Sequence, residues 1–396
     1  MARLHGMICS TTVCKPLGKY LKLVPSLSVA LLGLTCLSSC GGGGGSGSSG
    51  PPVADYVYQV PAQLSDGWLV SSLETEGVDA PSLTNMMNEI SRQGHDDFLR
   101  NILVIKNNRL VFEEYFGGTH VDTLSHLQSA TKSIVSAVYG IAEMNGFVGS
   151  TDNFLFIYFP EYQHLSNVDK DAIQLQHVLT MTPGLDWNEN SAPTFDTQND
   201  NIAAYASNNY IEYVLQKDLV NAPGTDWNYN SGCPMILAGI IKNRSGVHID
   251  EFGDEYLLQP LGITQRRWEY QSDGLPLATG GLWLRARDAA KIGQLFLDGG
   301  LWNGQQVISA EWVDRSLTAH TSVRNGTDYG YLWWTQQRAS HRLWYAAGYG
   351  GQLIILVPDS DVTIVINANY SHDTNETGQR QSSIWNLLTN FILPAI

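Results

Sequence analysis

The chain has 396 residues, 43% of them hydrophobic and 15% charged, so it is long enough for an enzyme with a large buried core. Its 38 acidic residues exceed its 23 basic residues and give a formal net charge of −15. This acidic balance argues against nucleic acid and against anionic membrane surfaces as partners.

The first forty residues have the pattern of an export signal. Three lysines precede an apolar run, residues 23–37, which is too short and too interrupted to span a membrane as a helix. The run ends in Leu-Ser-Ser before Cys40, which resembles the lipobox of bacterial lipoproteins, where the cysteine is lipidated and becomes the new N-terminus. We therefore expect a lipoprotein signal peptide over residues 1–39. An ordinary cleaved signal with a soluble product is the alternative.

A Gly/Ser-rich stretch over residues 40–55 follows and is typical of a flexible tether. Because Gly41 rather than Asp follows the cysteine, the resemblance implies an anchor in the outer membrane of a bacterial cell envelope, facing the periplasm. A soluble periplasmic or secreted protein is the alternative location. Cys233 is then the single cysteine left for the folded part, so we predict no intrachain disulfide there and interpret the thiol as core filler.

Strand patterns occur near both ends of the chain. A hairpin is predicted within residues 100–117, because two apolar runs flank Asn107-Asn108. Two further strands are predicted at 353–357 and 362–366, joined by a turn-forming segment.

Helical, loop-rich sequence fills the middle of the chain, from about residue 145 to 275, and the helical period returns at 382–392. The sequence thus predicts an α/β (α+β) fold, in which a sheet is built from both ends and a mostly helical domain is inserted.

A helix predicted over residues 128–146 begins with a serine and a lysine three positions apart, Ser129 and Lys132. Residues at i and i+3 share one helix face about 5–6 Å apart, so the amine can reach the hydroxyl. A lysine kept neutral by burial could accept the hydroxyl proton, and the helix N-terminus favours the resulting negative charge. The alternative is that Ser129 and Lys132 are two surface residues of an ordinary helix, since a serine at a helix start is a common N-cap.

Other catalytic signatures are absent from the sequence. It contains no G-x-S-x-G elbow, no H-E-x-x-H, no Walker A, no Rossmann fingerprint and no C-x-x-C. Its ten histidines show no ligand spacing, so we predict neither a metal site nor a cofactor.

Three later stretches combine turn glycines with polar and aromatic side chains. The first, residues 177–189, ends in a Pro-Gly turn with Asp186 and Trp187. The second, residues 221–232, places Tyr229 and Ser231 before an apolar helical run. The third enters a strand through Gly348-Tyr349-Gly350-Gly351, where the glycines permit a ligand to approach the backbone closely.

The order and spacing of these motifs resemble the serine β-lactamase and penicillin-binding-protein superfamily. The phrases SATKS, LTMTPGLDW, PGTDWNYNSG, TGGLWLRARDAAKIGQLFLDGG and AAGYGGQLIILVPD are similar to its branch of class C-related esterases and 6-aminohexanoate-dimer hydrolases. The resemblance covers about residues 80–395. It implies one serine hydrolase domain, with an antiparallel sheet flanked by helices.

Carried over residue by residue, the resemblance implies a catalytic group of three side chains. Ser129 is the nucleophile, Lys132 the general base, and Tyr229 relays a proton to the leaving group. The oxyanion hole is expected at the backbone N–H groups of Ser129 and Gln352. Substrate-binding roles are expected for the remaining motif residues: Ser231, Tyr349, Gly350, Gly351, Asp186 and Trp187.

Two departures from the family pattern bear on the substrate. Tyr349 stands where lactamase-type enzymes carry a lysine that meets a substrate carboxylate, and Ser231 stands where many relatives have Asn. Both changes favour a small carboxylic ester or linear amide over β-lactams and peptidoglycan. Tryptophans in or near the motifs suggest an aromatic-walled cleft, and the Asn- and Asp-rich residues 190–226 are expected to shape it. The aromatic residues concerned are Trp187, Trp227, Trp333, Trp334 and Trp344.

Two alternative functions stay open at this point. One is a β-lactamase or D-Ala-D-Ala carboxypeptidase-like cell-wall enzyme with the same fold. The other is a non-catalytic penicillin-binding-like module, against which the complete Ser129, Lys132 and Tyr229 set argues.

Overall fold

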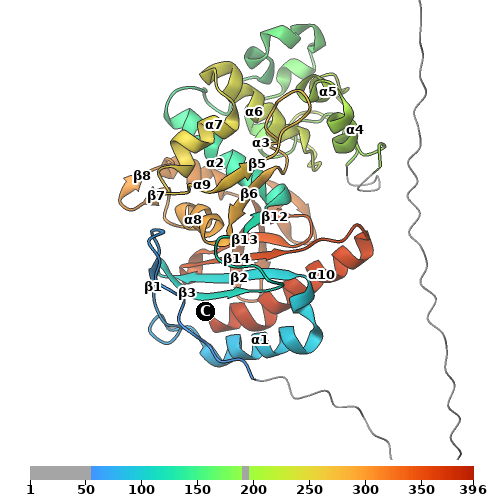
Figure 1. Ribbon diagram of the computed structural model, residues 1–396. Coiled ribbons are helices and arrows are strands. Elements are labelled where there is room, and N and C mark those ends of the chain that lie inside the picture. Colours follow the sequence, from blue (N-terminus) through green and yellow to red (C-terminus); the bar gives the residue numbers. More distant parts are fainter. Residues whose placement is uncertain (1–54, 190–195) are drawn as a thin grey trace, which may run out of the picture. The chain divides into compact units, whose positions relative to one another are not determined.

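The computed structural model describes residues 55–189 and 196–396, which lie within one compact unit, Val53–Ile396. Among these residues, nine strands form one sheet in the order β1-β3-β2-β14-β13-β12-β11-β10-β9 (Figure 1). Neighbouring strands are antiparallel except β1 and β3. The strands are β1 (Leu69–Val70), β2 (Leu99–Lys106), β3 (Arg109–Tyr115), β9 (Thr321–Arg324), β10 (Thr327–Tyr329), β11 (Trp334–Arg338), β12 (His341–Gly348), β13 (Gln352–Val357) and β14 (Val362–Ala368).

The sheet joins the two ends of the chain. Strand β2 pairs with β14 from Val362 opposite Lys106 onward, so residues about 260 positions apart lie side by side. The predicted hairpin is present as β2 and β3. Its turn residues Asn107 and Asn108 have φ of 52° and 62°, which matches the left-handed pair of a two-residue hairpin turn.

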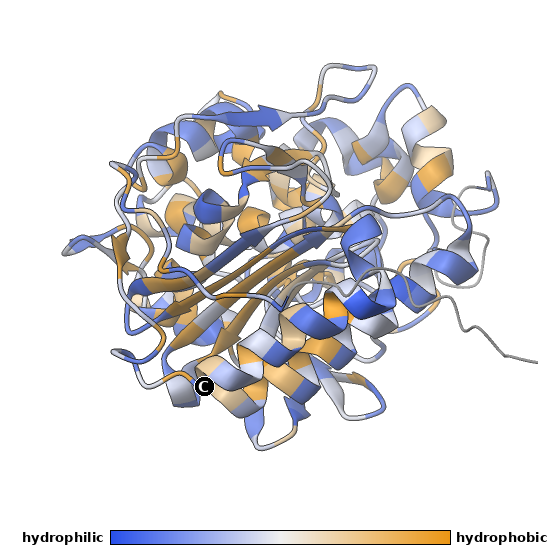
Figure 2. Cartoon of the chain, turned by 60° about the horizontal axis from the view of Figure 1, so that its bottom comes forward, coloured by the Kyte–Doolittle hydropathy of each residue, from blue (hydrophilic) through white to orange (hydrophobic). Residues whose placement is uncertain are grey.

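Helices cover both faces of this sheet. Along β13 the side chains alternate between two cores: Ile354 packs with α2 (Thr131–Met144) and α8 (Ala286–Leu297), and Leu353 packs with α1 (Ala80–Gln93) and α10 (Thr374–Leu387). Both faces of the strand are buried, and β13 is apolar from Leu353 to Val357. Figure 2 shows these apolar strands enclosed between helices. The α/β class expected from the sequence is confirmed.

Between β4 (Leu124–His126) and β6 (Leu282–Arg285) the chain is mostly helical and lies above the sheet in Figure 1. Strand β5 (Arg266–Trp268) joins β4 and β6 in a small sheet. The helices of this region are α3 (Leu175–Leu179), α4 (Asp200–Ala206), α5 (Tyr210–Leu215), α6 (Gly232–Ser245) and α7 (Ile249–Gly253). The remaining elements are β7 (Leu301–Trp302), β8 (Gln305–Gln306), α9 (Ala310–Ser316) and α11 (Leu393–Ala395).

Hydrogen bonds from a buried arginine hold the segment that precedes the sheet. Arg287, on α8, donates to the carbonyl of Ala62 at 3.0 Å and to the carboxylate of Asp66 at 3.0 Å, and it also pairs with Glu113. Only 2% of its side chain is exposed, so these partners replace water around the charge.

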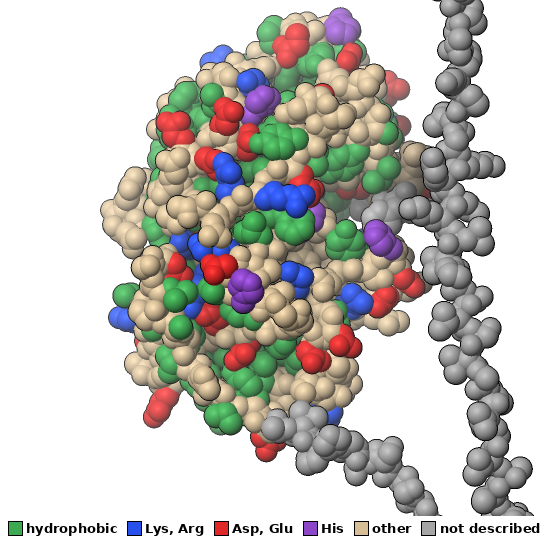
Figure 3. Space-filling view, in the orientation of Figure 1, with side chains coloured by type: hydrophobic (Ala, Val, Ile, Leu, Met, Phe, Trp, Pro, Cys, Tyr) green, Lys and Arg blue, Asp and Glu red, His purple; other side chains and the backbone are tan. Residues whose placement is uncertain are grey.

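Charge is spread over the surface of the described part. Acidic and basic side chains are interspersed on the face shown in Figure 3. In the described ranges no helix is both long enough and apolar enough to cross a membrane. Signal, lipidation and tether predictions for residues 1–54 concern a segment outside the described residues.

Candidate active site

Ser129 lies in a 3₁₀ turn, Gln128–Ala130, between β4 and α2. The preceding residue, Gln128, has φ of 49°, a left-handed conformation that costs a non-glycine residue roughly 1–2 kcal/mol. Two glycines allow close packing around this strained turn. A Cβ on Gly348 would meet the carbonyl oxygen of Leu127 at 2.2 Å, and one on Gly280 would meet the Gln128 backbone at 3.2 Å. The end of β12 therefore lies directly against the turn that presents the serine.

Lys132 sits one helical turn further along, with 2% of its surface exposed. Its Nζ is 2.9 Å from Ser129 Oγ and donates to the carbonyl of Thr279 at 2.6 Å. Burial lowers the pKa of this amine to about 8, against the opposing effect of the Glu189 carboxylate. The neutral form, which can accept a proton, is therefore available near neutral pH.

Tyr229 approaches from the loop before α6. Its hydroxyl is hydrogen-bonded to Ser129, and its ring lies 5.1 Å from Lys132 Nζ. Burial raises the pKa of this phenol far above its usual range, so the group stays a neutral O–H that can donate a proton. The structure thus brings Ser129, Lys132 and Tyr229 together from two segments about one hundred residues apart.

Ser129 and Tyr229 face a pocket of about 450 Å³, and Lys132 lines a small adjoining cavity together with Ser129. Glu189, Tyr205 and Trp334 also line the larger pocket. Trp334 stacks on the Tyr229 ring, with 5.9 Å between the ring centroids. This size is typical of pockets that bind small organic molecules.

Ser231 has a different contact from the one expected. Its backbone N–H donates to one Glu189 carboxylate oxygen at 2.8 Å and its hydroxyl to the other at 2.7 Å. Trp187 Nε1 also donates to Glu189, at 2.8 Å. Ser231 and Trp187 are buried and fix the carboxylate in the pocket wall, and Ser231 also lines the small adjoining cavity beside Ser129 and Lys132.

The glycine-rich stretch around residues 348–351 lies partly in the pocket wall and partly in the sheet interior. Ala347, Gly348 and Tyr349 line the pocket beside Ser129. Gly350, with φ of 87°, packs against Tyr370. Gln352 pairs with Gly348 in the β12–β13 ladder, and its buried side chain donates to the carbonyl of Ala368 at 2.6 Å.

The structure does not bring Asp186 to the pocket. Its side chain is exposed, and its backbone N–H donates to the carbonyl of Asp218 at 2.8 Å. Of the tryptophans expected in an aromatic cleft, Trp334 lines the pocket and Trp227 packs on Tyr229, whereas Trp333 and Trp344 belong to the core. Residues 190–195 lie outside the described residues, but α4 from the same region contributes Asn201, Ile202 and Tyr205 to the wall.

Sequence reasoning missed several pocket residues. Glu189 stands at the end of the motif stretch 177–189, and a carboxylate without a nearby basic residue in the sequence was the signal that could have drawn attention to it. Gln381 enters the pocket from α10, about 250 residues after Ser129, and no sequence signal points to it. Cys233 is a buried free thiol whose pKa is raised by burial, as fits core filler. No cluster of metal-binding side chains occurs in the described ranges.

Comparison with known proteins agrees with this architecture. Residues 101–387 match the family model described as Beta-lactamase. A 6-aminohexanoate-dimer hydrolase of Paenarthrobacter ureafaciens is 27% identical over 281 residues, which covers 66% of this chain and 70% of that protein.

Two solved structures illustrate how widely the fold is shared. One is EstCE1, a hydrolase with promiscuous acyltransferase activity (TM-score 0.62, 12% identity, 77% of this chain and 99% of that one). The other is an octameric penicillin-binding protein homologue from Pyrococcus abyssi (TM-score 0.60, 17% identity, 78% and 79% covered). At these identities they show the fold alone. The chain therefore belongs to the beta-lactamase family, as a hydrolase related in sequence to 6-aminohexanoate-dimer hydrolase.

Proposed function

We propose that this protein hydrolyses carboxylic esters or small linear amides through an acyl-enzyme on Ser129. The observation that carries the proposal is the contact of one hydroxyl with two proton-transfer groups. Ser129 Oγ lies 2.9 Å from the Lys132 amine and is hydrogen-bonded to the Tyr229 phenol. A weak nucleophile with an adjacent base is the arrangement that covalent hydrolysis requires.

In the proposed reaction, neutral Lys132 accepts the Ser129 proton as Oγ attacks the substrate carbonyl carbon. The tetrahedral intermediate collapses to an acyl-Ser129 ester as the leaving alcohol or amine takes a proton from the Tyr229 hydroxyl. The Lys132 proton then returns to Tyr229. Water attacks the acyl group, giving up one proton through the same groups, and releases the carboxylic acid and free Ser129.

For the oxyanion hole we assign the backbone N–H groups of Ser129 and Tyr349, with Tyr349 in place of Gln352. Two observations support this assignment. Strand β12 ends at Gly348 in contact with the turn before Ser129, and the next residue, Tyr349, lines the catalytic pocket. Gln352 lies across the ladder from Gly348 and is not among the residues lining that pocket. Donors close to the developing oxyanion are typically worth 10²–10³ in rate.

The charge of the pocket supports an uncharged substrate over a lactam. Glu189 lines the pocket, whereas no lysine or arginine does so among the described residues. Ala346 and Ala347 precede Gly348 on β12, so no cation is present at this strand end to pair with a substrate carboxylate. A carboxylate on the substrate would meet a like charge instead.

An activity-based probe tests the proposal. A fluorophosphonate should label Ser129, as located by peptide mass spectrometry, and the protein should hydrolyse p-nitrophenyl acetate and butyrate. Ser129→Ala should lose both the label and the activity, whereas Ser150→Ala, at an exposed serine, should keep both. Full turnover by Ser129→Ala would overturn the proposal. Rapid nitrocefin turnover without ester hydrolysis would favour the lactam alternative, and no labelling or turnover with any ester, amide or lactam would favour a binding module.

We propose further that Cys40 is lipidated after removal of residues 1–39 and that the chain is anchored to the periplasmic side of the outer membrane. Support comes from the basic and apolar segment before Leu-Ser-Ser-Cys and from the compact unit that begins at Val53, beyond the Gly/Ser-rich stretch. Cys40→Ser, expressed in a bacterial host, should lose incorporation of a labelled fatty acid and should leave the membrane fraction. Lipidation would be contradicted if the wild type took up no labelled fatty acid and Cys40→Ser stayed in the membrane fraction like the wild type.

A further inference from the structure

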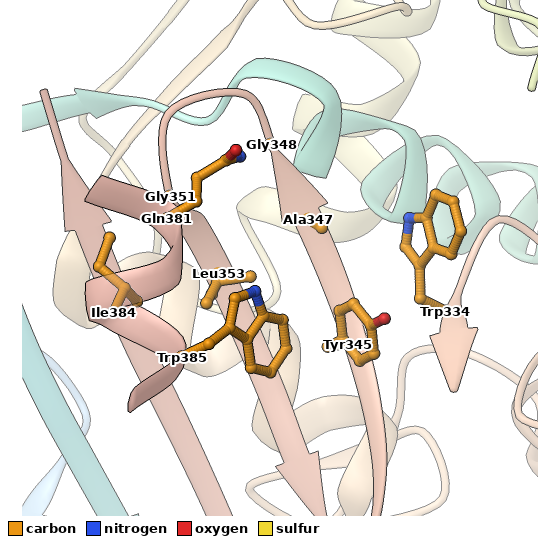
Figure 4. A pocket seen from close by; sticks show the side chains of 9 residues that line it. All are labelled: Trp334, Tyr345, Ala347, Gly348, Gly351, Leu353, Gln381, Ile384 and Trp385. Atoms are coloured by element: carbon orange, nitrogen blue, oxygen red, sulfur yellow. The ribbon is translucent and has the colours of Figure 1, made fainter. Parts of the chain in front are cut away.

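A second, apolar compartment lies beside the catalytic pocket. It has a volume of about 200 Å³ and is bounded by β12, the beginning of β13 and α10 (Figure 4). Its walls include Tyr345, Leu353, Ile384 and Trp385. No charged side chain lines it in the described part of the chain. The compartment thus offers an environment for an uncharged, apolar group.

The compartment and the catalytic pocket share part of their walls. Trp334, Ala347, Gly348 and Gln381 line both of them. Gly348 also contacts the turn that carries Ser129. A chain attached to a carbonyl that reacts at Ser129 therefore lies close to the compartment.

The fold holds this compartment open. Gly351 has φ of 97°, and a Cβ at this position would meet Ile384 Cδ1 at 2.2 Å, so only glycine leaves the wall undisturbed. Leu353 and Ile384 belong to the buried core between the sheet and α10. Trp385 is fixed from two sides: its ring packs edge-on against Tyr345 at 5.2 Å, and the Arg338 guanidinium lies over it at 4.7 Å. Such walls do not need to rearrange to receive a ligand.

We propose that this compartment binds the apolar group of the substrate, which is a phenyl ring or a short alkyl chain. A dry apolar cavity of about 150 Å³ takes up benzene, so a space of this size fits a group of that bulk. The inference rests on the proposed function, because it places the rest of a substrate whose carbonyl meets Ser129. It names the substrate class as small esters or amides with one apolar arm.

Chain-length series test this proposal. One series lengthens the acyl side, from p-nitrophenyl acetate to octanoate, and the other lengthens the alcohol side, from methyl to octyl acetate followed by acid release. Each methylene buried should raise kcat/KM about fourfold until the compartment is full. The series that shows this rise identifies which side of the substrate occupies the compartment.

Two variants alter the compartment without touching the catalytic group. Trp385→Ala removes a half-buried wall, and Leu353→Phe fills the interior. Both should leave kcat/KM for the shortest ester within about twofold and lower it at least tenfold for the best long-chain ester. Asn386→Ala, at the exposed neighbouring position on α10, is the matched control and should behave as the wild type.

The outcomes separate the two proposals. If both folded variants keep the wild-type chain-length profile in both series, the compartment does not bind substrate, although Ser129-dependent ester hydrolysis still stands. If Ser129 is neither labelled nor required for hydrolysis, the proposed function and this inference fall together. Circular dichroism and melting temperature establish that each variant is folded.

Discussion

At the scale of single residues, Ser231 shows what the sequence can and cannot predict. The sequence identified Ser231 as a motif residue but did not identify its hydrogen-bond partner. That partner is Glu189, which lies 42 residues earlier in the chain. Ser129 and Lys132 could be paired from helix geometry alone, since their contact is local. Tyr349 was recognised as a site residue, but its assignment as an oxyanion donor required the end of β12 to be located against the serine.

The buried amine of Lys132 predicts the acid limb of the pH profile. Below its pKa of about 8 the amine is protonated and cannot accept the Ser129 proton, so kcat/KM should rise with pH through a midpoint near 8. Lys132→Arg, which cannot deprotonate, should lower kcat/KM about 100-fold or more at every pH. A pH–rate profile with p-nitrophenyl butyrate measures both effects. A midpoint near 6 would contradict the role of this lysine as the base.

Glu189 predicts the direction in which that midpoint moves. Its negative charge raises the pKa of Lys132, so Glu189→Gln should lower the pKa and shift the acid limb of kcat/KM toward lower pH. The other groups around the amine are Tyr229 and Cys233, with His126 and Glu269 across a small adjoining cavity, and they remain in the variant.

Asp226→Asn is the matched control for this shift. It removes an exposed carboxylate from the same loop as Tyr229 but outside the pocket lining. It should leave the midpoint in place. An equal shift in both variants would mean that net charge, rather than the carboxylate fixed by Ser231, controls the amine.

At the scale of elements, strands with short connections were predictable and long-range pairing was not. The β2–β3 hairpin and the strands β13 and β14 lie where the sequence placed them, because turn residues and apolar runs are local signals. Helix α10 begins at Thr374, eight residues before the predicted start, because its first turns are polar and show no apolar period. Its beginning is set by Asp373, which accepts hydrogen bonds from the N–H groups of Asn375 and Glu376.

Two helical glycines predict opposite effects of the same substitution. A Cβ on Gly140, in α2, would meet Trp312 at 2.3 Å, so Gly140→Ala should lower the free energy of unfolding by about 1–3 kcal/mol. A Cβ on Gly378, in α10, meets nothing within 4 Å, so Gly378→Ala should raise it by about 0.5–1 kcal/mol. Urea unfolding compares the pair. Equal stabilities would show that the Trp312 ring moves aside without cost.

At the scale of the whole molecule, the order of the strands in the sheet could not be derived from the sequence. Neither apolar period nor turn chemistry indicates that β2 lies beside β14, or that α10 forms part of the pocket wall. Strand patterns near both ends of the chain predicted a sheet built from both ends, and the structure adds the order of its strands and the place of α10.

Truncation at the N-terminus tests where the folded unit begins. A chain starting at Val53 should keep its stability and ester hydrolysis, because the compact unit starts there. A chain starting at Gly67 should lose about 3–5 kcal/mol of stability, because the buried Arg287 then loses Ala62 and Asp66 as partners. Urea denaturation of the two truncated proteins measures the difference. Equal stability would mean that Glu113 alone satisfies the arginine.

Because β2 pairs with β14, the sheet cannot be complete before β14 has been synthesised. A growing polypeptide contains the serine, the lysine and the phenol well before the ribosome reaches the strand that closes the sheet beside them. Nascent intermediates therefore hold the reactive side chains without the wall built by β12 and α10. The proposed hydrolysis should begin only once β12 and α10 have been synthesised and have completed the pocket wall.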